Sequence, residues 1–134
     1  MHYGRILASC GLIEEALSAF DTVIENCSLC PGIFSRLYGF AFRDQKQEIL
    51  RFISPDIERW AWSDFGNSLF FAECLAVAGD SGNAMDWLEN AVNLGFVNYP
   101  FLNEYDSFLN NIRGEKRFKR LMERVKHEWE NFEV

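Results

Sequence analysis

The chain has 134 residues, the length of one domain, and its hydrophobic content of 49% with 13 Phe and 4 Trp excludes a disordered protein. The formal net charge is −7, and the surplus of acidic groups lies before residue 113, because the remaining segment carries 7 basic and 5 acidic groups. An acidic body repels phosphate backbones, and no apolar run reaches the roughly 18 residues of a membrane span. We therefore expect neither nucleic-acid binding nor membrane binding.

Two stretches separated by 68 residues share one pattern. Both "GLIEEALSAFDTVI" (11–24) and "GDSGNAMDWLENAV" (79–92) run from a Gly through four residues to an Ala, and then to a bulky apolar residue four positions later. We expect Gly11 and Gly79 each to end a helix in a left-handed turn. Ala16 and Ala84, together with Gly4 upstream, are small enough to let antiparallel helices pack closely. The pattern predicts a helix pair around each of the two glycines.

This pattern resembles the tetratricopeptide repeat, whose period of about 34 residues is half the observed separation. The resemblance implies an all-α fold, an array of antiparallel helix pairs closed by a C-terminal capping helix. We expect a single domain over residues 1–134, with repeats at about 1–31, 32–64 and 65–98 and a cap over 99–134.

The middle repeat is interrupted by a proline. Its first helix, "GIFSRLYGFAF" (32–42), fits the pattern, but Pro55 falls where the second helix should still be running. We therefore predict a shortened helix from about Gln45 to Ile53. Ser54 should then cap an extra short helix that reaches Trp60, with Pro55 in its first turn.

In the last third of the chain, the sequence predicts the end of one helix, the N-cap of another and a long C-terminal helix. Gly95 should end a helix, and Asp106 should cap another one. From Glu115 onward, apolar residues recur at the spacing of one helix face, which predicts a long amphipathic helix that covers the open end of the stack. The residues of this face are Phe118, Leu121, Met122, Val125, Trp129 and Phe132.

Residues 86–132, which begin "DWLENAVNLGF", resemble the closing segment of tetratricopeptide regions attached to bacterial serine/threonine kinases and adenylate cyclases. This resemblance implies a non-catalytic, protein-binding module of a cytoplasmic bacterial signalling protein whose catalytic domain lies elsewhere. Met1 falls inside the first predicted helix, so we expect the chain to be part of a longer protein.

Cys27 and Cys30 form a C-x-x-C pair, which can act as a dithiol or as half of a zinc site. Zinc needs two further ligands, and the remaining cysteines and histidines are not paired at metal spacing. The simplest interpretation is that both cysteines finish the second helix of the first repeat and pack there. A thiol-based redox sensor that uses Cys27 and Cys30 is the alternative function.

Motifs for catalysis are absent from the sequence. It contains no Gly-rich phosphate loop and no G-x-S-x-G elbow, and its carboxylates fall at helix starts or on polar faces, where water and the helix dipole account for them. We predict that the protein is not an enzyme and uses no metal or other cofactor. A small enzyme of unrecognised type is a further alternative.

In tetratricopeptide arrays the first helices of the repeats line a concave groove that binds a protein or peptide segment. Carried over by the resemblance, the groove residues here are Arg5, Ser9, Ser35, Gly39, Phe42, Arg43, Leu69, Glu73 and Val77. Because Glu73 opposes the two arginines, the groove suits a mixed or apolar segment better than a terminal carboxylate.

A second predicted surface combines Trp62 and Phe65. They would form one apolar stripe with Leu69 if a single helix runs through Gly66. The last helices would cover this stripe, or it would bind a partner or a second copy of the chain as a homodimer.

Overall fold

A computed structural model describes residues 1–132 of the chain. Every regular element in that part is helical, with eight α-helices, one π-helical turn and one 3-10 helix and no strand among the described residues. The predicted all-α class is confirmed.

The chain divides into two compact units, Met1–Phe52 and a second one that begins at Ile53. Each unit has helices that pack on one another and its own buried side chains. The expectation that residues 1–134 act as one domain stays a prediction.

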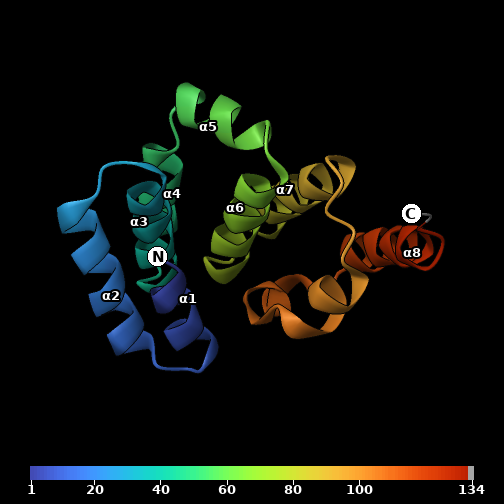
Figure 1. Ribbon diagram of the computed structural model, residues 1–134, viewed down its shortest axis with the longest axis horizontal. Helices are drawn as coiled ribbons and strands as arrows, with labels where there is room; N and C mark the ends of the chain where they lie inside the picture. Colours follow the sequence, from blue (N-terminus) through green and yellow to red (C-terminus); the bar gives the residue numbers. More distant parts are fainter. Residues whose placement is uncertain (133–134) are drawn as a thin grey trace. The chain divides into compact units, whose positions relative to one another are not determined.

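The first unit contains α1 (His2–Ser9), α2 (Ile13–Asn26), α3 (Cys30–Phe42) and α4 (Lys46–Phe52). Along the chain, each helix packs on the next one (Figure 1). Phe20 of α2 and Tyr38 of α3 are fully buried, and their rings stack with centroids 5.6 Å apart. Gly4 of α1 lies directly against the Phe20 ring, because a Cβ added at Gly4 would come within 2.5 Å of Phe20 Cε1. The core of this unit therefore depends on a residue without a side chain.

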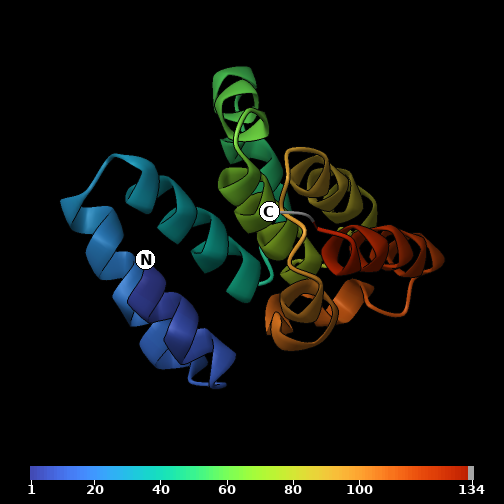
Figure 2. The ribbon, with the colours of Figure 1, turned by 45° about the vertical axis from the view of Figure 1, so that its right-hand side comes forward.

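The second unit contains α5 (Pro55–Trp62), α6 (Phe65–Val77), α7 (Ser81–Asn93), the π-helical turn η1 (Phe101–Tyr105), the 3-10 helix η2 (Ser107–Ile112) and α8 (Lys116–Glu130). Helix α6 is central: α5, α7 and η2 all pack against it, while α8 packs on α7 (Figure 2). Accordingly α6 is apolar around most of its circumference, and residues 71–76 are all buried.

Within the described part of the chain, four helices end in the same left-handed turn. Gly11, Gly79 and Gly95 have φ values of +80°, +82° and +110°, and they follow α1, α6 and α7 as predicted. The residue after each glycine donates its N–H to a carbonyl five residues earlier, which satisfies a carbonyl that the helix leaves unpaired. Helix α3 ends in the same way at Asp44, whose φ is 56°.

The consequences predicted for Pro55 are confirmed. Helix α4 stops at Phe52, and Ser54 Oγ accepts a hydrogen bond from the Ile57 N–H at 3.3 Å at the start of α5. Helix α5 continues to Trp62, two residues beyond the predicted end. The predicted cap at Asp106 is also confirmed, because its Oδ1 accepts from the Phe108 N–H at 3.1 Å.

The amphipathic C-terminal helix is present, but its predicted apolar face is only partly buried. Phe118, Leu121, Met122 and Val125 are buried, in agreement with the prediction. In contrast, Trp129 is 46% exposed and Phe132, which follows the end of α8, is 69% exposed. The prediction that these two aromatics share the buried face is wrong, because burial along this face ends at Val125.

Polar side chains fasten the irregular parts of the second unit. The Asn90 amide on α7 donates to the Trp62 carbonyl at 2.8 Å and to Ser68 Oγ at 2.9 Å, and Ser68 donates in turn to the Ala61 carbonyl at 3.1 Å. This network ties the end of α5 to α6 and α7.

Farther along, the Arg113 guanidinium donates to the carbonyls of Leu102, Asn103 and Asp106. Burial lowers the pKa of Arg113, and the nearby Asp106 charge opposes that effect.

Replacement of Asn90 by Ala should destabilise the second unit. The substitution removes two hydrogen bonds, one of them buried, and leaves the Trp62 carbonyl without its amide donor, which costs about 1–3 kcal/mol. Asn67 is a control asparagine in the same unit, because its side chain forms no hydrogen bond among the described residues, and its Ala variant should change stability by less than about 0.5 kcal/mol. Urea denaturation measures both free energies of unfolding, and equal losses would contradict this role of Asn90.

Gly4→Ala and Gly82→Ala should change stability in opposite directions. At Gly82 a new Cβ meets nothing within 4 Å, so the higher helix propensity of Ala should stabilise α7 by roughly 0.5–1 kcal/mol. At Gly4 the new Cβ overlaps the buried Phe20 ring, and overpacking of this kind costs about 1–3 kcal/mol. Thermal and urea unfolding of both variants test the difference, and a stabilised Gly4→Ala protein would show that the ring moves aside freely.

Candidate functional site

The predicted groove residues come from both units, since α1 and α3 belong to the first unit and α6 to the second. Ser35, Gly39, Leu69 and Glu73 are buried; Arg5, Phe42 and Val77 are half-buried; Ser9 and Arg43 are exposed. A groove that combines these residues depends on both units together and stays a prediction.

Both predicted groove cations have contacts within the first unit. Arg43 Nη2 forms an ion pair with Asp21 Oδ2 at 2.8 Å. The Arg5 guanidinium lies over the Tyr38 ring, 5.6 Å from its centroid. A ligand carboxylate would have to compete with these contacts, and the preference of the groove for a mixed or apolar segment stays a prediction.

The predicted stripe of Trp62, Phe65 and Leu69 is interrupted. Helix α5 ends at Trp62, and Asp64 starts α6 by accepting the Asn67 N–H at 2.8 Å. The chain therefore breaks between Trp62 and Phe65, and the condition for one continuous stripe, a single helix from Trp62 through Gly66, is not met. Leu69 is buried in α6, whereas Trp62 and Phe65 remain 43% and 47% exposed.

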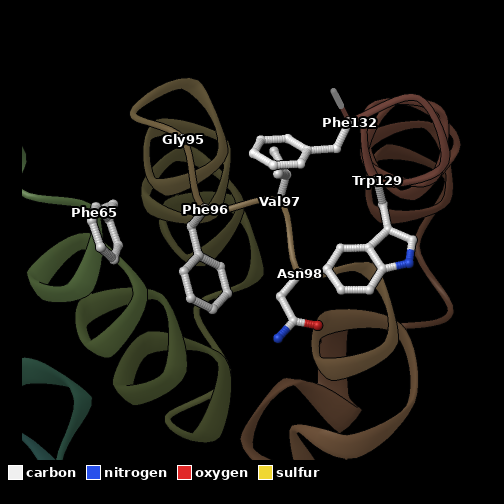
Figure 3. A pocket seen from close by; sticks show the side chains of 7 residues that line it. All are labelled: Phe65, Gly95, Phe96, Val97, Asn98, Trp129 and Phe132. Carbon is white, nitrogen blue, oxygen red and sulfur yellow. The ribbon is translucent and has the colours of Figure 1, made fainter. Parts of the chain in front are cut away.

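Phe65 contributes to a surface pocket of about 560 Å³ within the second unit, which we call the aromatic pocket. Its walls come from the start of α6, the loop after α7 and the end of α8. In Figure 3, Phe65 and Phe96 stand on one side and Trp129 on the other, with Val97 and Asn98 between them. The residues that line the pocket are Phe65, Gly95, Phe96, Val97, Asn98, Trp129 and Phe132.

The loop after α7 is fixed at both ends. Gly95 turns the chain in its left-handed conformation, and the Phe96 N–H bonds back to the Ala91 carbonyl at 2.9 Å. At the other end, Asn98 Oδ1 accepts from the Phe101 N–H at 3.2 Å. The Phe96 ring lies between those of Phe65 and Phe101, with centroid distances of 5.9 and 6.0 Å. The floor of the aromatic pocket is thus formed by a constrained loop.

Ion pairs help to hold α8, which carries the opposite wall, against α7. Arg117 Nη2 lies 2.5 Å from Asp86 Oδ1, and Arg117 Nε lies 2.7 Å from Glu89 Oε1. Hydrogen bonds to the Glu89 and Asp86 carboxylates raise the pKa of Arg117, so it stays charged. Arg124 adds a hydrogen bond to Asn93 Oδ1 at 2.7 Å. With the buried apolar face of α8, these contacts position Trp129 at the rim of the pocket.

Of the exposed aromatics around this pocket, the sequence predicts only Phe65 as part of an interaction surface, whereas it predicts Trp129 and Phe132 as part of the apolar face of α8. Phe96 and Val97 could have been recognised as candidate surface residues, since they directly follow a predicted helix stop and belong to no apolar helix face. Trp129 and Phe132 could not, because their spacing continues that of the buried residues of α8 and so suggests burial. Three segments distant in sequence meet only in the folded unit.

The C-x-x-C pair lies in the junction between α2 and α3. Helix α2 ends at Asn26, Cys27 is extended, and Cys30 is the first residue of α3. The prediction that both cysteines finish the second helix of the first repeat is wrong, because Pro31 suits the first turn of a helix and α3 starts beside it. Both thiols are free, with Cys30 exposed.

Within residues 1–132, no group of three or more His, Cys, Asp or Glu side chains is arranged to hold a metal ion. None of the described helices has the length and apolar character needed to cross a membrane.

Comparisons of the chain with protein-family models, with curated proteins and with solved structures found no match.

The aromatic pocket should take up a small apolar probe. We expect Nile red fluorescence to increase in the presence of the protein, and most of that increase to disappear in Phe65→Ser and Trp129→Ser, which remove opposite walls. Tyr105→Ser is the control, because Tyr105 is 73% exposed and lies outside the pocket lining. Tyr105→Ser should keep its stability within about 0.5 kcal/mol, since the side chain is largely exposed, and circular dichroism should show that Phe65→Ser and Trp129→Ser remain folded. Unchanged fluorescence in both pocket variants would contradict uptake at this site.

Proposed function

We propose that this chain is a non-catalytic protein-interaction module built from tetratricopeptide-like helix pairs, and that its aromatic pocket receives apolar side chains of a partner protein segment. The proposal rests chiefly on one observation. Phe65, Trp129 and Phe132 surround a pocket of about 560 Å³ while remaining 46–69% exposed.

Exposed aromatics grouped around a concavity favour a binding role. Isolated apolar residues are common on protein surfaces, but contiguous apolar patches mark sites of interaction. Aromatic anchors supply a large share of binding free energy at protein interfaces, because they bury much area for few rotatable bonds. The constrained loop at Phe96 adds to this, since a preformed surface needs little ordering when a partner binds.

Local similarity between the two units supports the tetratricopeptide-like part of the proposal. Helices α1 and α6 end in left-handed turns at Gly11 and Gly79, which are 68 residues apart. Ala16 and Ala84 occupy equivalent positions in the helices that follow, and both have no exposed area. The two sequence stretches that share the Gly-to-Ala spacing therefore also share a left-handed turn at the Gly and a buried Ala in the next helix.

The proposed context is a bacterial signalling protein in the cytoplasm, and it follows from the resemblance of residues 86–132 to closing segments of regions attached to kinases and adenylate cyclases. In that context the catalytic step belongs to another domain. The contribution of this chain would be to recruit or position a partner through the aromatic pocket.

Selection from a random peptide display library on the immobilised chain tests the proposal. We expect enrichment of peptides with two or more apolar anchors, and at least about a tenfold loss of affinity in Phe65→Ser combined with Trp129→Ser, because each aromatic anchor contributes more than about 1 kcal/mol. Tyr105→Ser serves again as the exposed aromatic control. Circular dichroism and melting temperature establish that the variants are folded. Peptides that bind the double variant as tightly as the unmodified chain would refute binding in the aromatic pocket.

A further inference from the structure

A second concavity of about 300 Å³ is lined by the end of α5 and by α7, and we call it the acidic pocket. Its lining includes the rings of Trp62 and Trp87 and the carboxylates of Glu58, Asp86 and Glu89. Like the aromatic pocket, it is formed entirely by residues of the second unit.

The Trp62 ring is held in place and remains partly exposed. It meets the Trp87 ring edge to face, with centroids 4.8 Å apart and an interplanar angle of 68°. Trp87 is buried and lies against Phe71 at 4.5 Å, and the Trp62 backbone carbonyl is fixed by the Asn90 amide. Trp62 also lines a neighbouring hollow together with Glu58 and Arg59. It therefore presents aromatic surface from a rigid support.

The charges around the acidic pocket are unbalanced. Asp86 and Glu89 share the single guanidinium of Arg117. Glu58 is exposed, and its carboxylate forms no ion pair or hydrogen bond with a side chain of the described residues. The nearest cation on the same helix, Arg59, pairs with Asp56 at 3.2 Å. Glu58 stands one turn before Trp62, so its unpaired charge and the indole lie on one face of α5.

An indole face and an unpaired carboxylate attract the same type of group. The ring quadrupole favours a cation above its face, with Trp the strongest of the aromatic residues. A carboxylate adds direct attraction, which is greater in a partly desolvated pocket than in bulk water. The side chains of Lys and Arg meet both requirements, since their stems pack on apolar surface while the charged end reaches the carboxylate.

We propose that the acidic pocket binds a Lys or Arg side chain of the same partner segment whose apolar side chains enter the aromatic pocket. This inference rests on the proposed function and adds the chemistry of the partner. Trp62 and Phe65, one at each pocket, are three residues apart, so their Cα atoms are separated by at most about 11 Å. That span corresponds to about three residues of an extended partner or about seven of a helix. The basic residue should therefore lie within that spacing of the apolar anchor.

A basic partner segment fits better than a second copy of the chain. The chain carries a net charge of −7, and two copies repel each other. A segment with a net positive charge is attracted to the same surface and gains contacts at both pockets.

The test combines the peptide selection with two charge variants. Glu58→Lys and Asp56→Lys change the net charge equally and lie on the same helix, but only Glu58 lines the acidic pocket. We expect the selected peptides to contain Lys or Arg close to the apolar anchors. A synthetic peptide should lose about tenfold in affinity when that residue is changed to Gln or when the protein carries Glu58→Lys. With Asp56→Lys the loss of peptide affinity should stay below about threefold. The peptide in which the basic residue is Gln should bind Glu58→Lys and the unmodified chain with the same affinity.

The outcomes separate the two proposals. Apolar peptides without a preference for Lys or Arg, or equal losses in the two charge variants, would overturn the cation site and leave the aromatic pocket supported. Absence of any enrichment, or binding that survives Phe65→Ser with Trp129→Ser, would overturn the proposed function itself. Light scattering on the chain alone tests whether a second copy of the chain occupies this surface. A dimer that dissociates when Phe65→Ser is combined with Trp129→Ser would assign the surface to a second copy and reject the basic segment.

Discussion

Close approach of helices across small residues is the constraint on which both units depend. In the first unit, Gly4 leaves room for the Phe20 ring, and that ring stacks on Tyr38 to join α1, α2 and α3. In the second unit, Ala72 and Ala84 have no exposed area where α6 and α7 pack together. Because these positions carry almost no side chain, the larger residues around them interlock, and the helices cannot shift without opening cavities.

Both pockets follow from irregularities in this packing. Pro55 separates α4 from α5, and the Ser63–Asp64 break separates α5 from α6, which leaves Trp62 and Phe65 at adjoining helix ends. Helix α8 extends beyond its buried face, so Trp129 reaches the rim of the aromatic pocket. Arg117 links the two sites physically, since it helps to hold α8 on α7 through Asp86 and Glu89, which also line the acidic pocket. A surface of this kind requires elements that depart from a regular repeat.

Local chemistry made much of the helical framework predictable, whereas the sites depend on tertiary structure. Glycines after α1, α6 and α7, the Ser54 and Asp106 caps and the effect of Pro55 each act within a few residues, so the sequence reveals them. Asp44 performs the same turn as the glycines without their signature. The end of α5 was predicted two residues early, at Trp60, and the apolar spacing from Trp62 to Leu69 gives no sign of the break, because it continues across the Asp64 cap. The aromatic pocket joins three distant segments, and periodicity in one helix carries no information about that meeting.

The edge-to-face contact between Trp62 and Trp87 has a spectroscopic consequence. Indole rings whose centroids are 4.8 Å apart couple electronically when they absorb ultraviolet light, so we expect an exciton contribution beside the helical one in the far-ultraviolet circular dichroism of this chain. Helix content derived from that spectrum alone would therefore be biased. The same contribution would provide an intrinsic optical reporter, because a cation bound over the outer indole would alter the transitions of that ring while the backbone stays unchanged.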